Sequence, residues 1–495
     1  MKASVMSIAI KARAWRLQPA PIQAPTPSRA PRLRWLAVLV GAAALGGCAS
    51  FSPDGGFAAV EKLAKDRLGK DLQWARSDAD LDTIAKRVNE LLAKPLTVDD
   101  AVQVALLNNR GLQATFQDLG ITEAEVVQAG RLPNPGFSFG RLTRGSEVEL
   151  ERGLHFNLAR LIALPFIGQM EARRFEQTKS MVAMQVLSLA ADTRKAWVNA
   201  LAAEETVRYM RQVKEVADAS SELARRMAQV GNFNKLQRAR EQGFYADAAL
   251  NLAQAERAQG ATRERLTRLL GAWGAQTQFS LPERLPDLPK EALDLPDVER
   301  LALAQRLDVQ SAKLAAEQTA RNLGLTRTTR FINVLELGLR HNSSNEMPSQ
   351  RGWEIGFELP LFDWGSARVA RAEAVYMQTV HRAADAAINA RSEVREAYTG
   401  YRSAYDIARH HRDEIVPLRQ RIAEENQLRY NGMLIGVFEL LADARSQIAS
   451  VNAAIQAKRD FWIAQADLDM ALIGKPSLTA AAGPAMAADS GGAAH

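Results

Sequence analysis

Residues 169–230 read QMEARRFEQTKSMVAMQVLSLAADTRKAWVNALAAEETVRYMRQVKEVADASSELARRMAQV and contain neither glycine nor proline. Ala, Glu, Arg, Gln, Leu and Met dominate this stretch, and all six residue types favour helix. The pattern predicts one continuous helix of about 90 Å at 1.5 Å per residue. Such a helix is much longer than those of globular domains, so it needs partners along its length, as in a coiled coil or a helical tunnel.

The long helix is followed by a sharp break and a second helical pattern. Residues 231–234 (GNFN) supply the break, and residues 235–270 continue as helix before Gly271. A similar pair comes later, with residues 366–431, a turn at 432–436 and a return arm at 437–473. The sequence therefore predicts two long helical hairpins.

The first arm of the second hairpin contains two residues that disfavour helix, Gly400 and Pro417. We expect both to interrupt the arm. Pro417 should kink it, because proline lacks a backbone donor and clashes with the preceding turn.

The plan of the chain is repeated. Residues 101–113 (AVQVALLNNRGLQ) align at a constant offset with residues 298–310 (VERLALAQRLDVQ) and share Ala, Leu and Gln at equivalent positions. Each segment precedes a pair of short strands and then a long hairpin, in the same order. This order favours an internal duplication.

The amino terminus has the pattern of an export signal. Basic residues precede an apolar run at residues 35–47, which is far below the roughly 20 residues of a membrane-spanning helix. The run ends in Leu45-Gly46-Gly47-Cys48, which resembles a bacterial lipobox, and Cys48 is the one cysteine of the chain. We expect Cys48 to carry lipid, and Ala49 in place of aspartate implies sorting to the outer membrane.

Charge excludes nucleic acid as a partner. Of the 63 basic residues, seven lie in residues 1–47, which contain no acid, and the remaining 56 equal the 56 acidic residues. The mature chain is thus neutral and lacks the basic footprint of a nucleic-acid binder.

Four short segments alternate between apolar and polar residues: 137–139, 154–158, 334–340 and 354–359. In the third segment the residues that should share a face are Leu335, Leu337 and Leu339, and in the fourth they are Ile355, Phe357 and Leu359. Such alternation is typical of a half-buried strand in any antiparallel sheet, and equally of a barrel strand between lipid and water. Four strands cannot close a barrel, whereas the twelve strands of a homotrimer can.

The order and spacing of several segments resemble the TolC-like outer-membrane efflux channels from about residue 96 to residue 474. Residues 96–109 resemble the opening helix of that family, 129–135 the approach to its first strand, 357–365 the exit from its last strand and 429–432 its second hairpin tip. Residues 163–168 follow the strand-exit pattern only loosely, and residues 236–238 (LQR) lack the usual acidic residue of the first tip.

The resemblance implies a mixed, mainly α fold. Long α-helical hairpins would form a periplasmic tunnel, and four transmembrane β-strands per protomer would build a twelve-stranded barrel in outer-membrane lipid. It also implies a passive exit duct, fed by an inner-membrane efflux pump through a periplasmic adaptor protein. The alternatives are the exit channel of a protein-secretion pump, or a non-conducting coiled-coil scaffold or adaptor lipoprotein.

The adaptor is expected at the two hairpin tips, and the alternative there is a plain solvated turn. The tip residues are Gly231, Asn232 and Phe233 in the first hairpin and Asn431, Gly432, Met433 and Leu434 in the second. We expect Gly432 to adopt the left-handed conformation that reverses the chain.

A ring of carboxylates could constrict the tunnel. Glu424 and Glu425 lie about two turns before Gly432, and three symmetric copies would repel one another and favour cations. A solvated helix face is the alternative, and Arg421 or Arg429 could neutralise the pair.

Neither metal, cofactor nor catalysis is expected. His410 and His411 are adjacent among six histidines, but neighbours on a helix point about 100° apart and do not chelate together. The sequence lacks HExxH, GxSxG, P-loop and GxGxxG motifs, so we expect no enzyme.

These patterns divide the chain into five parts. We expect a lipoprotein signal peptide at 1–47, an N-terminal periplasmic segment at 48–95, a first repeat at 96–280, a second at 281–474 and a flexible tail at 475–495.

Overall fold

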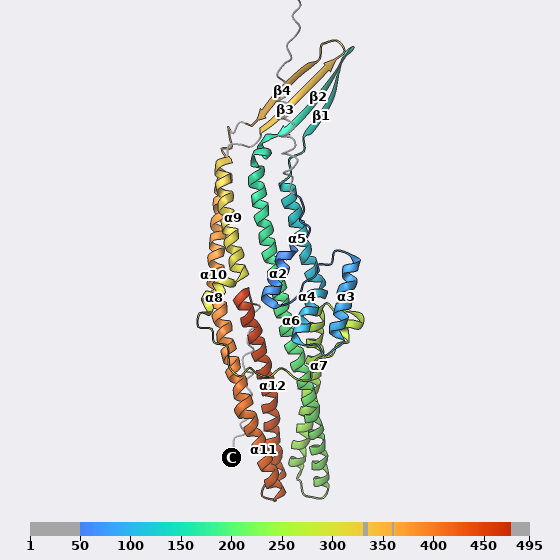
Figure 1. The fold of residues 1–495 in the computed structure, drawn as a ribbon. Coiled ribbons are helices and arrows are strands. Elements are labelled where there is room, and N and C mark those ends of the chain that lie inside the picture. The colour runs from blue at the N-terminus through green and yellow to red at the C-terminus, as the bar shows by residue number, and fades with distance from the viewer. Residues whose placement is uncertain (1–49, 330–334, 359–360, 477–495) are drawn as a thin grey trace, which may run out of the picture. The chain divides into compact units, whose positions relative to one another are not determined.

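The computed structural model describes residues 50–329, 335–358 and 361–476 (Figure 1). Cys48, the predicted signal peptide and most of the predicted tail lie outside these residues. The elements of the first half are α2 (Phe57–Leu68), α3 (Asp78–Leu92), α4 (Val98–Asn108), α5 (Arg110–Ala129), β1 (Gly136–Arg144), β2 (Glu147–Asn157), α6 (Leu158–Gln229), α7 (Lys235–Leu270) and the 3₁₀ turn η1 (Gly274–Thr277). Those of the second half are α8 (Val298–Gln305), α9 (Leu307–Thr329), β3 (Leu335–Ser344), β4 (Gln350–Phe357), α10 (Ser366–His410), the π-helical turn η2 (His411–Ile415), α11 (Val416–Asn431) and α12 (Val437–Ile473).

The predicted long helix is confirmed as α6, but it begins at Leu158 and has 72 residues. At 1.5 Å per residue it is about 110 Å long. Asn157 ends β2 and caps α6, because its side chain accepts the backbone N–H of Arg160 at 2.8 Å. The helix therefore follows the strand directly, and the predicted strand exit at 163–168 is helical in spite of Pro165.

Both hairpins are confirmed, and α7 and α12 have the predicted bounds. Small side chains let α6 and α7 pack closely, since Ala217 and Ala248 are buried together with Val213. Further up the hairpin, Val207, Met210 and Ala255 form a similar cluster. This packing supplies the partner that so long a helix needs.

The first arm of the second hairpin is broken once. Gly400 lies inside α10 and does not interrupt it, contrary to the prediction, because a single glycine lowers helix stability without removing a hydrogen bond. The predicted break at Pro417 is confirmed as η2, which separates α10 from α11. The wider π turn accommodates a proline that donates no backbone hydrogen bond and would clash with the carbonyl one turn earlier.

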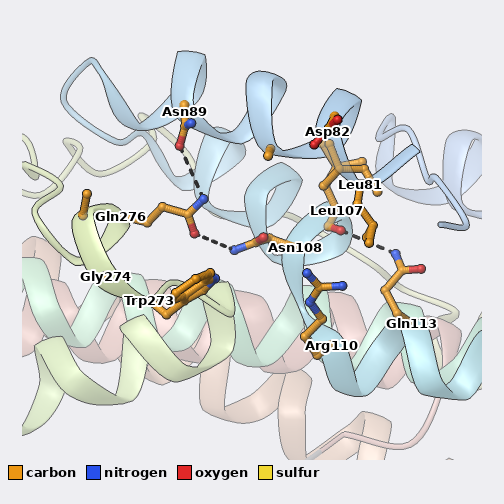
Figure 2. Close-up of a pocket in the computed structure, with 13 residues that line it drawn as sticks. Leu81, Asp82, Asn89, Leu107, Asn108, Arg110, Gln113, Trp273, Gly274 and Gln276 are labelled. Atoms are coloured by element: carbon orange, nitrogen blue, oxygen red, sulfur yellow. Dashed lines mark hydrogen bonds between the residues drawn. The ribbon is translucent and has the colours of Figure 1, made fainter. Parts of the chain in front are cut away.

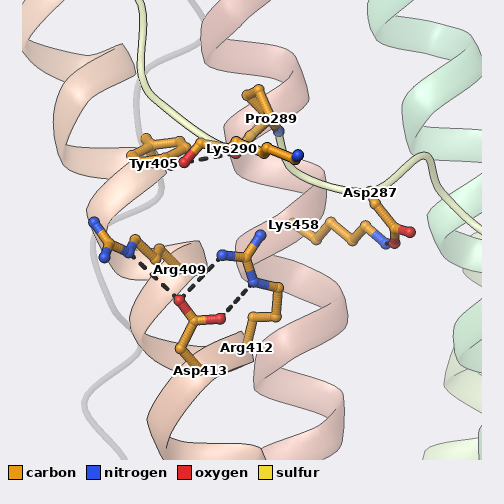
Figure 3. A network of polar contacts seen from close by, with 8 residues as sticks. All are labelled: Asp287, Pro289, Lys290, Tyr405, Arg409, Arg412, Asp413 and Lys458. Carbon is orange, nitrogen blue, oxygen red and sulfur yellow. Dashed lines mark hydrogen bonds and ion pairs between the residues drawn. The ribbon is translucent and has the colours of Figure 1, made fainter.

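Polar contacts hold this break in place (Figure 3). The guanidinium of Arg412 donates to the carboxylate of Asp413 at 2.6 and 3.0 Å, and Arg409 donates to the same carboxylate at 3.4 Å. One turn earlier, the hydroxyl of Tyr405 donates to the carbonyl of Lys290 at 2.8 Å. The loop that connects the two halves is thus attached to α10 beside the π turn.

Equivalent residues of the two halves have the same backbone geometry. The break between α4 and α5 falls at Asn109, with φ −68° and ψ 114°, and the break between α8 and α9 falls at Arg306, with φ −67° and ψ 123°. After each break a glutamine amide donates to a backbone carbonyl six residues earlier: Gln113 to Leu107 at 3.5 Å and Gln310 to Ala304 at 2.9 Å. These matches support the proposed duplication.

The side chains that stabilise the two breaks differ. The Asn109 amide donates to the carbonyl of Leu269 at 3.0 Å. Arg306 is 1% exposed and pairs with Asp308 and Glu393, each at 2.7 Å. The two breaks thus share a backbone shape and differ in their polar partners.

The four strands form one antiparallel sheet in the order β1-β2-β3-β4. The pairing of β2 with β3 joins the two halves of the chain, and β1 and β4 each keep an unpaired edge. Leu335 pairs with Phe357 and Leu337 with Ile355, so the predicted apolar face is confirmed for these residues, whereas Leu359 lies outside the described residues. Within the described ranges, no helix has both the length and the apolar character required to cross a membrane.

Candidate functional site: the two hairpin tips

The first tip is a tight reversal between α6 and α7. Gly231 has φ 80°, in the left-handed region, and the Asn232 N–H donates to the carbonyl of Met227 at 2.9 Å. Asn234 then caps α7 in a reciprocal pair of 2.8 Å bonds with Gln237. Gln237 thus completes a capping box at the start of α7.

The second tip has the same hydrogen bonds with different residues. The N–H groups of Gly432, Met433 and Leu434 donate to carbonyls four, three and five residues earlier, as those of Val230, Gly231 and Asn232 do. The left-handed residue is Met433, with φ 56°, whereas Gly432 has φ −80°. The prediction of a left-handed Gly432 is wrong, because the turn geometry assigns that conformation to the next residue.

The tips differ in the side chains they expose. Met433 is 93% exposed and Leu434 76%, and Val230 is 72% exposed at the first tip. Phe233, a predicted tip residue, is 8% exposed. It therefore belongs to the interior of its hairpin. The accessible apolar residues near this tip include Val230 and Leu236, neither of which was predicted as a tip residue.

The outer surface of the first hairpin carries a charged cluster near its tip. Glu222 accepts hydrogen bonds from Arg225 at 2.7 Å and from Arg226 at 2.8 Å. Hydrogen bonds from Arg225 and Arg226 lower the pKa of Glu222 to about 2, so its carboxylate stays ionised in any physiological medium. All three groups are open to solvent, so salt screens the pairs.

A buried ion pair connects the two hairpins. Glu241 of α7 is 2% exposed and accepts the Arg445 guanidinium of α12 at 2.8 and 2.9 Å. The Ser220 hydroxyl of α6 donates to the same carboxylate at 2.6 Å, and the guanidinium lies 4.4 Å from the ring of Phe244. The arrangement fixes the arms of one hairpin against the return arm of the other.

Sequence reasoning missed this cluster. Glu241 and Arg445 are 204 residues apart, and each lies in a helical stretch rich in charged residues. Since no local pattern distinguishes them from solvated charges, only the docking of the hairpins reveals the pair.

The predicted gate carboxylates lie on α11 and are exposed in the protomer. Glu424 accepts from the Gln420 amide at 3.1 Å, and Glu425 lies 3.8 Å from Arg429. Arg429 is thus placed to neutralise Glu425, as the alternative prediction allowed. Behind them, Asn426 is buried and its amide donates to Asp443 of α12.

A cavity of about 400 Å³ lies between α3, the α4–α5 break and the loop after α7 (Figure 2). Gln276 donates to Asn89 at 3.4 Å, and Asn108 donates to Gln276 at 3.2 Å. Trp273, which also lines the cavity, is 75% exposed. The Gln276 amide therefore connects the loop after α7 to α3 and to α4. We interpret the cavity as a space left where these elements are held together, rather than as a binding site.

The described residues contain no cluster of metal-ligating side chains. Residues 50–329, 335–358 and 361–476 contain no group of three or more His, Cys, Asp or Glu side chains placed to hold a metal ion. His410 contacts Glu414 at 3.2 Å, as an ordinary pair one helical turn apart.

Comparison with solved structures identifies the fold. The chain superposes on the Campylobacter jejuni CmeC outer membrane channel with a TM-score of 0.65, at 17% identity over 83% of this chain and 91% of that one. For the Neisseria gonorrhoeae MtrE outer membrane channel the TM-score is 0.62, at 19% identity over 77% and 91%. For the outer-membrane channel OprN it is 0.64, at 18% identity over 82% and 94%. The fold is that of outer-membrane channels, as the resemblance to TolC-like proteins predicted.

One curated relative is similar in sequence. It is the cobalt-zinc-cadmium resistance protein CzcC of Cupriavidus metallidurans, 24% identical over 319 residues, which are 61% of this chain and 71% of the relative. No protein-family model matches the chain. The solved relatives are channel proteins rather than enzymes.

Proposed function

We propose that this protein is the outer-membrane exit channel of a tripartite efflux system, conducting passively what an inner-membrane pump delivers through a periplasmic adaptor. One observation carries the proposal: a four-stranded sheet with free edges continues directly into helical hairpins, in the fold of outer-membrane channels. The duct itself performs no chemistry.

The free edges of β1 and β4 account for trimerisation. Each edge presents unpaired backbone groups, which hydrocarbon does not tolerate. Pairing β1 of one protomer with β4 of the next satisfies them, and three copies close a barrel of about twelve strands. The exposed apolar side chains Phe137, Trp353 and Phe357 then face lipid.

The tips are the proposed adaptor contacts. They lie at the opposite end of α6 from the sheet, as chain connectivity requires, and they expose Met433, Leu434 and Val230. An unbranched thioether beside leucine suits an apolar groove on a partner.

Divalent cations are the substrate class that we favour. The polar face of the sheet holds five glutamates and two arginines, so a barrel built from it has an acidic lumen that favours cations. The curated relative is named a cobalt-zinc-cadmium resistance protein, which agrees with this class. Protein export remains the alternative cargo.

The decisive experiment is native mass spectrometry of the detergent-purified protein, followed by conductance in planar bilayers. We expect a trimer and cation-selective conductance. A stable monomer with intact strands would refute the shared barrel, and a trimer without conductance would favour the scaffold alternative.

The gate is tested in the same bilayers. If Glu424 and Glu425 line the constriction, Glu424→Gln with Glu425→Gln should reduce the preference for cations without reducing trimer yield. Glu222→Gln, on the first hairpin, is the matched control. Unchanged selectivity would assign the pair to a solvated face.

A further inference from the structure

The two faces of the sheet differ in the sign of their charges as well as in polarity. Side chains alternate along a strand, and cross-strand partners share a face. All five glutamates of the strands lie on the polar face: Glu147, Glu149, Glu151, Glu336 and Glu354. The apolar face contains no acidic residue, but it contains Arg141, Arg152 and Arg351.

These three arginines form a row with His341, here named the basic row. Arg152 is in register with His341, and His341 is in register with Arg351. His341 on β3 therefore lies between Arg152 on β2 and Arg351 on β4. Arg141 lies on β1 opposite Leu150, two residues nearer the hairpin turn. The basic row thus crosses all four strands.

Within the part of the chain that the structure describes, no carboxylate compensates the charge of the basic row. All three arginines are exposed, and among the described residues none of them forms an ion pair with a carboxylate. The nearest polar partner of Arg152 is His341, at 3.5 Å between Nη1 and Nδ1. On the polar face, by contrast, Arg340 pairs with Glu354 at 2.9 Å. Three arginines thus gather on one face of the sheet with no carboxylate beside them among the described residues, so an anion from outside the protomer would be attracted to them.

The position of the basic row along the strands matches one edge of an apolar band. From Phe357 to Arg351 is six residues, or about 20 Å along the strand and about 15 Å in height for a strand tilted by about 40°. On the helix side the band continues with exposed Leu161, Ile162 and Phe362. Together these approach the roughly 25 Å of a barrel's apolar band, with the basic row at the rim nearer the hairpin turns.

We propose that the basic row binds the phosphate groups of the glycolipid in the outer leaflet of the outer membrane. The inference rests on the proposed function, which turns the apolar face toward lipid and the hairpin turns toward the cell exterior. Guanidinium groups bind phosphate through paired hydrogen bonds. Trp353, 71% exposed on the same strand as Arg351, occupies the interfacial position at which tryptophan is enriched.

The test compares wild-type protein with the triple variant Arg141→Gln, Arg152→Gln, Arg351→Gln. The probes are rough lipopolysaccharide, the same glycolipid after chemical dephosphorylation, and inorganic phosphate alone. Binding is measured by native mass spectrometry and by isothermal titration calorimetry. We expect the triple variant to bind phosphorylated glycolipid on the order of 100-fold more weakly, since each arginine near an anionic lipid surface contributes about fivefold.

The matched control is Arg144→Gln with Arg340→Gln, which removes two arginines from the opposite face and should leave glycolipid binding unchanged. Wild-type affinity in the triple variant, or equal affinity for dephosphorylated glycolipid, would overturn the inference. Inorganic phosphate that binds and displaces the glycolipid would instead identify a free-phosphate site.

Assembly separates this inference from the proposed function. A wild-type protein that is neither trimeric nor conducting contradicts the function itself. If the protein is a conducting trimer but binds glycolipid equally well without the three arginines, only the lipid site is contradicted. Should the triple variant fail to assemble, Arg351→Gln alone is expected to weaken binding about fivefold, and unchanged binding would overturn the inference.

Discussion

The two hairpin tips have the same turn geometry although their sequences differ. Both reversals use the same hydrogen bonds, but the left-handed position is Gly231 in one and Met433 in the other. A non-glycine residue in this conformation costs about 1–2 kcal/mol. In the second tip this cost is offset by other contacts of the turn, and the apolar side chain of Met433 is 93% exposed.

The first prediction compares the two tip glycines. Gly231→Val should destabilise its turn by about 1–2 kcal/mol, because a β-branched residue is strained at φ 80°. Gly432→Val should be tolerated, since φ is −80° and the nearest atoms to an added Cβ are 3.6 Å away. Hydrogen exchange at the tips and cross-linking to the adaptor measure both effects. Equal loss in the two variants would contradict the assignment.

The second prediction concerns His411, in the π turn. Burial, together with the charge of His410, lowers the pKa of His411, and its Nδ1 is buried without a hydrogen-bond partner among the described residues. As the pH falls, His411 is protonated in the unfolded chain before it is protonated in the folded chain. The free energy of unfolding therefore decreases as the pH falls through about 6.5, the ordinary pKa of histidine.

His411→Gln should remove part of this acid sensitivity. We expect the melting temperature of the wild type to fall more between pH 7.5 and pH 5.5 than that of the variant. Exposed His381→Gln is the control and should behave as the wild type. Parallel losses in all three proteins would exclude His411 as the source.

At the scale of elements, each long helix depends on a neighbour. α6 is supported by α7 along the first hairpin, and α10 and α11 by α12 along the second. The Glu241–Arg445 pair then connects the hairpins to each other. Because the carboxylate is buried, its partner matters more than those of the exposed pairs nearby.

The third prediction removes that partner. Arg445→Met leaves Glu241 buried with only Ser220, and should destabilise the hairpin contact by about 3 kcal/mol. Adding Glu241→Gln should recover part of the loss. Arg225→Met, in the exposed pair with Glu222, should change little. Thermal unfolding and hydrogen exchange in α7 and α12 provide the measurement, and equal effects of Arg445→Met and Arg225→Met would argue against the buried pair.

At the scale of the whole molecule, the sheet and the tips are separated by the full length of α6. Membrane insertion and adaptor contact can therefore be altered independently. Lipidation at Cys48, which lies outside the described residues, is a third attachment that we propose from the Leu45-Gly46-Gly47-Cys48 pattern.

The fourth prediction tests this anchor. Cys48→Ala should abolish incorporation of labelled fatty acid, because no other cysteine exists to carry it. Trimer formation should persist, since the strands pair without the lipid. Gly46→Ala keeps a small residue at the cleavage site and should still be labelled. Label on the Cys48→Ala variant would disprove lipidation at Cys48.

Features that depend on neighbouring residues could be read from the sequence. The glycine-free run at 169–230 predicted a long helix, and α7 and α12 have their predicted bounds, because helix propensity and turn residues act over a few positions. The alternating strands likewise predicted the faces of the sheet, since the period of two is a property of the strand itself.

Other features depended on contacts between distant residues. The start of α6 at Leu158 follows from the end of β2 at Asn157, which pairs with the distant Glu336 of β3 and also caps the helix. Met433 rather than Gly432 takes the left-handed conformation because the two arms must meet at a fixed spacing. The contact between Glu241 and Arg445 depends on the docking of the two hairpins. The basic row depends on the register in which the strands pair. Neither could be predicted, because contacts between remote residues leave no local pattern in a sequence.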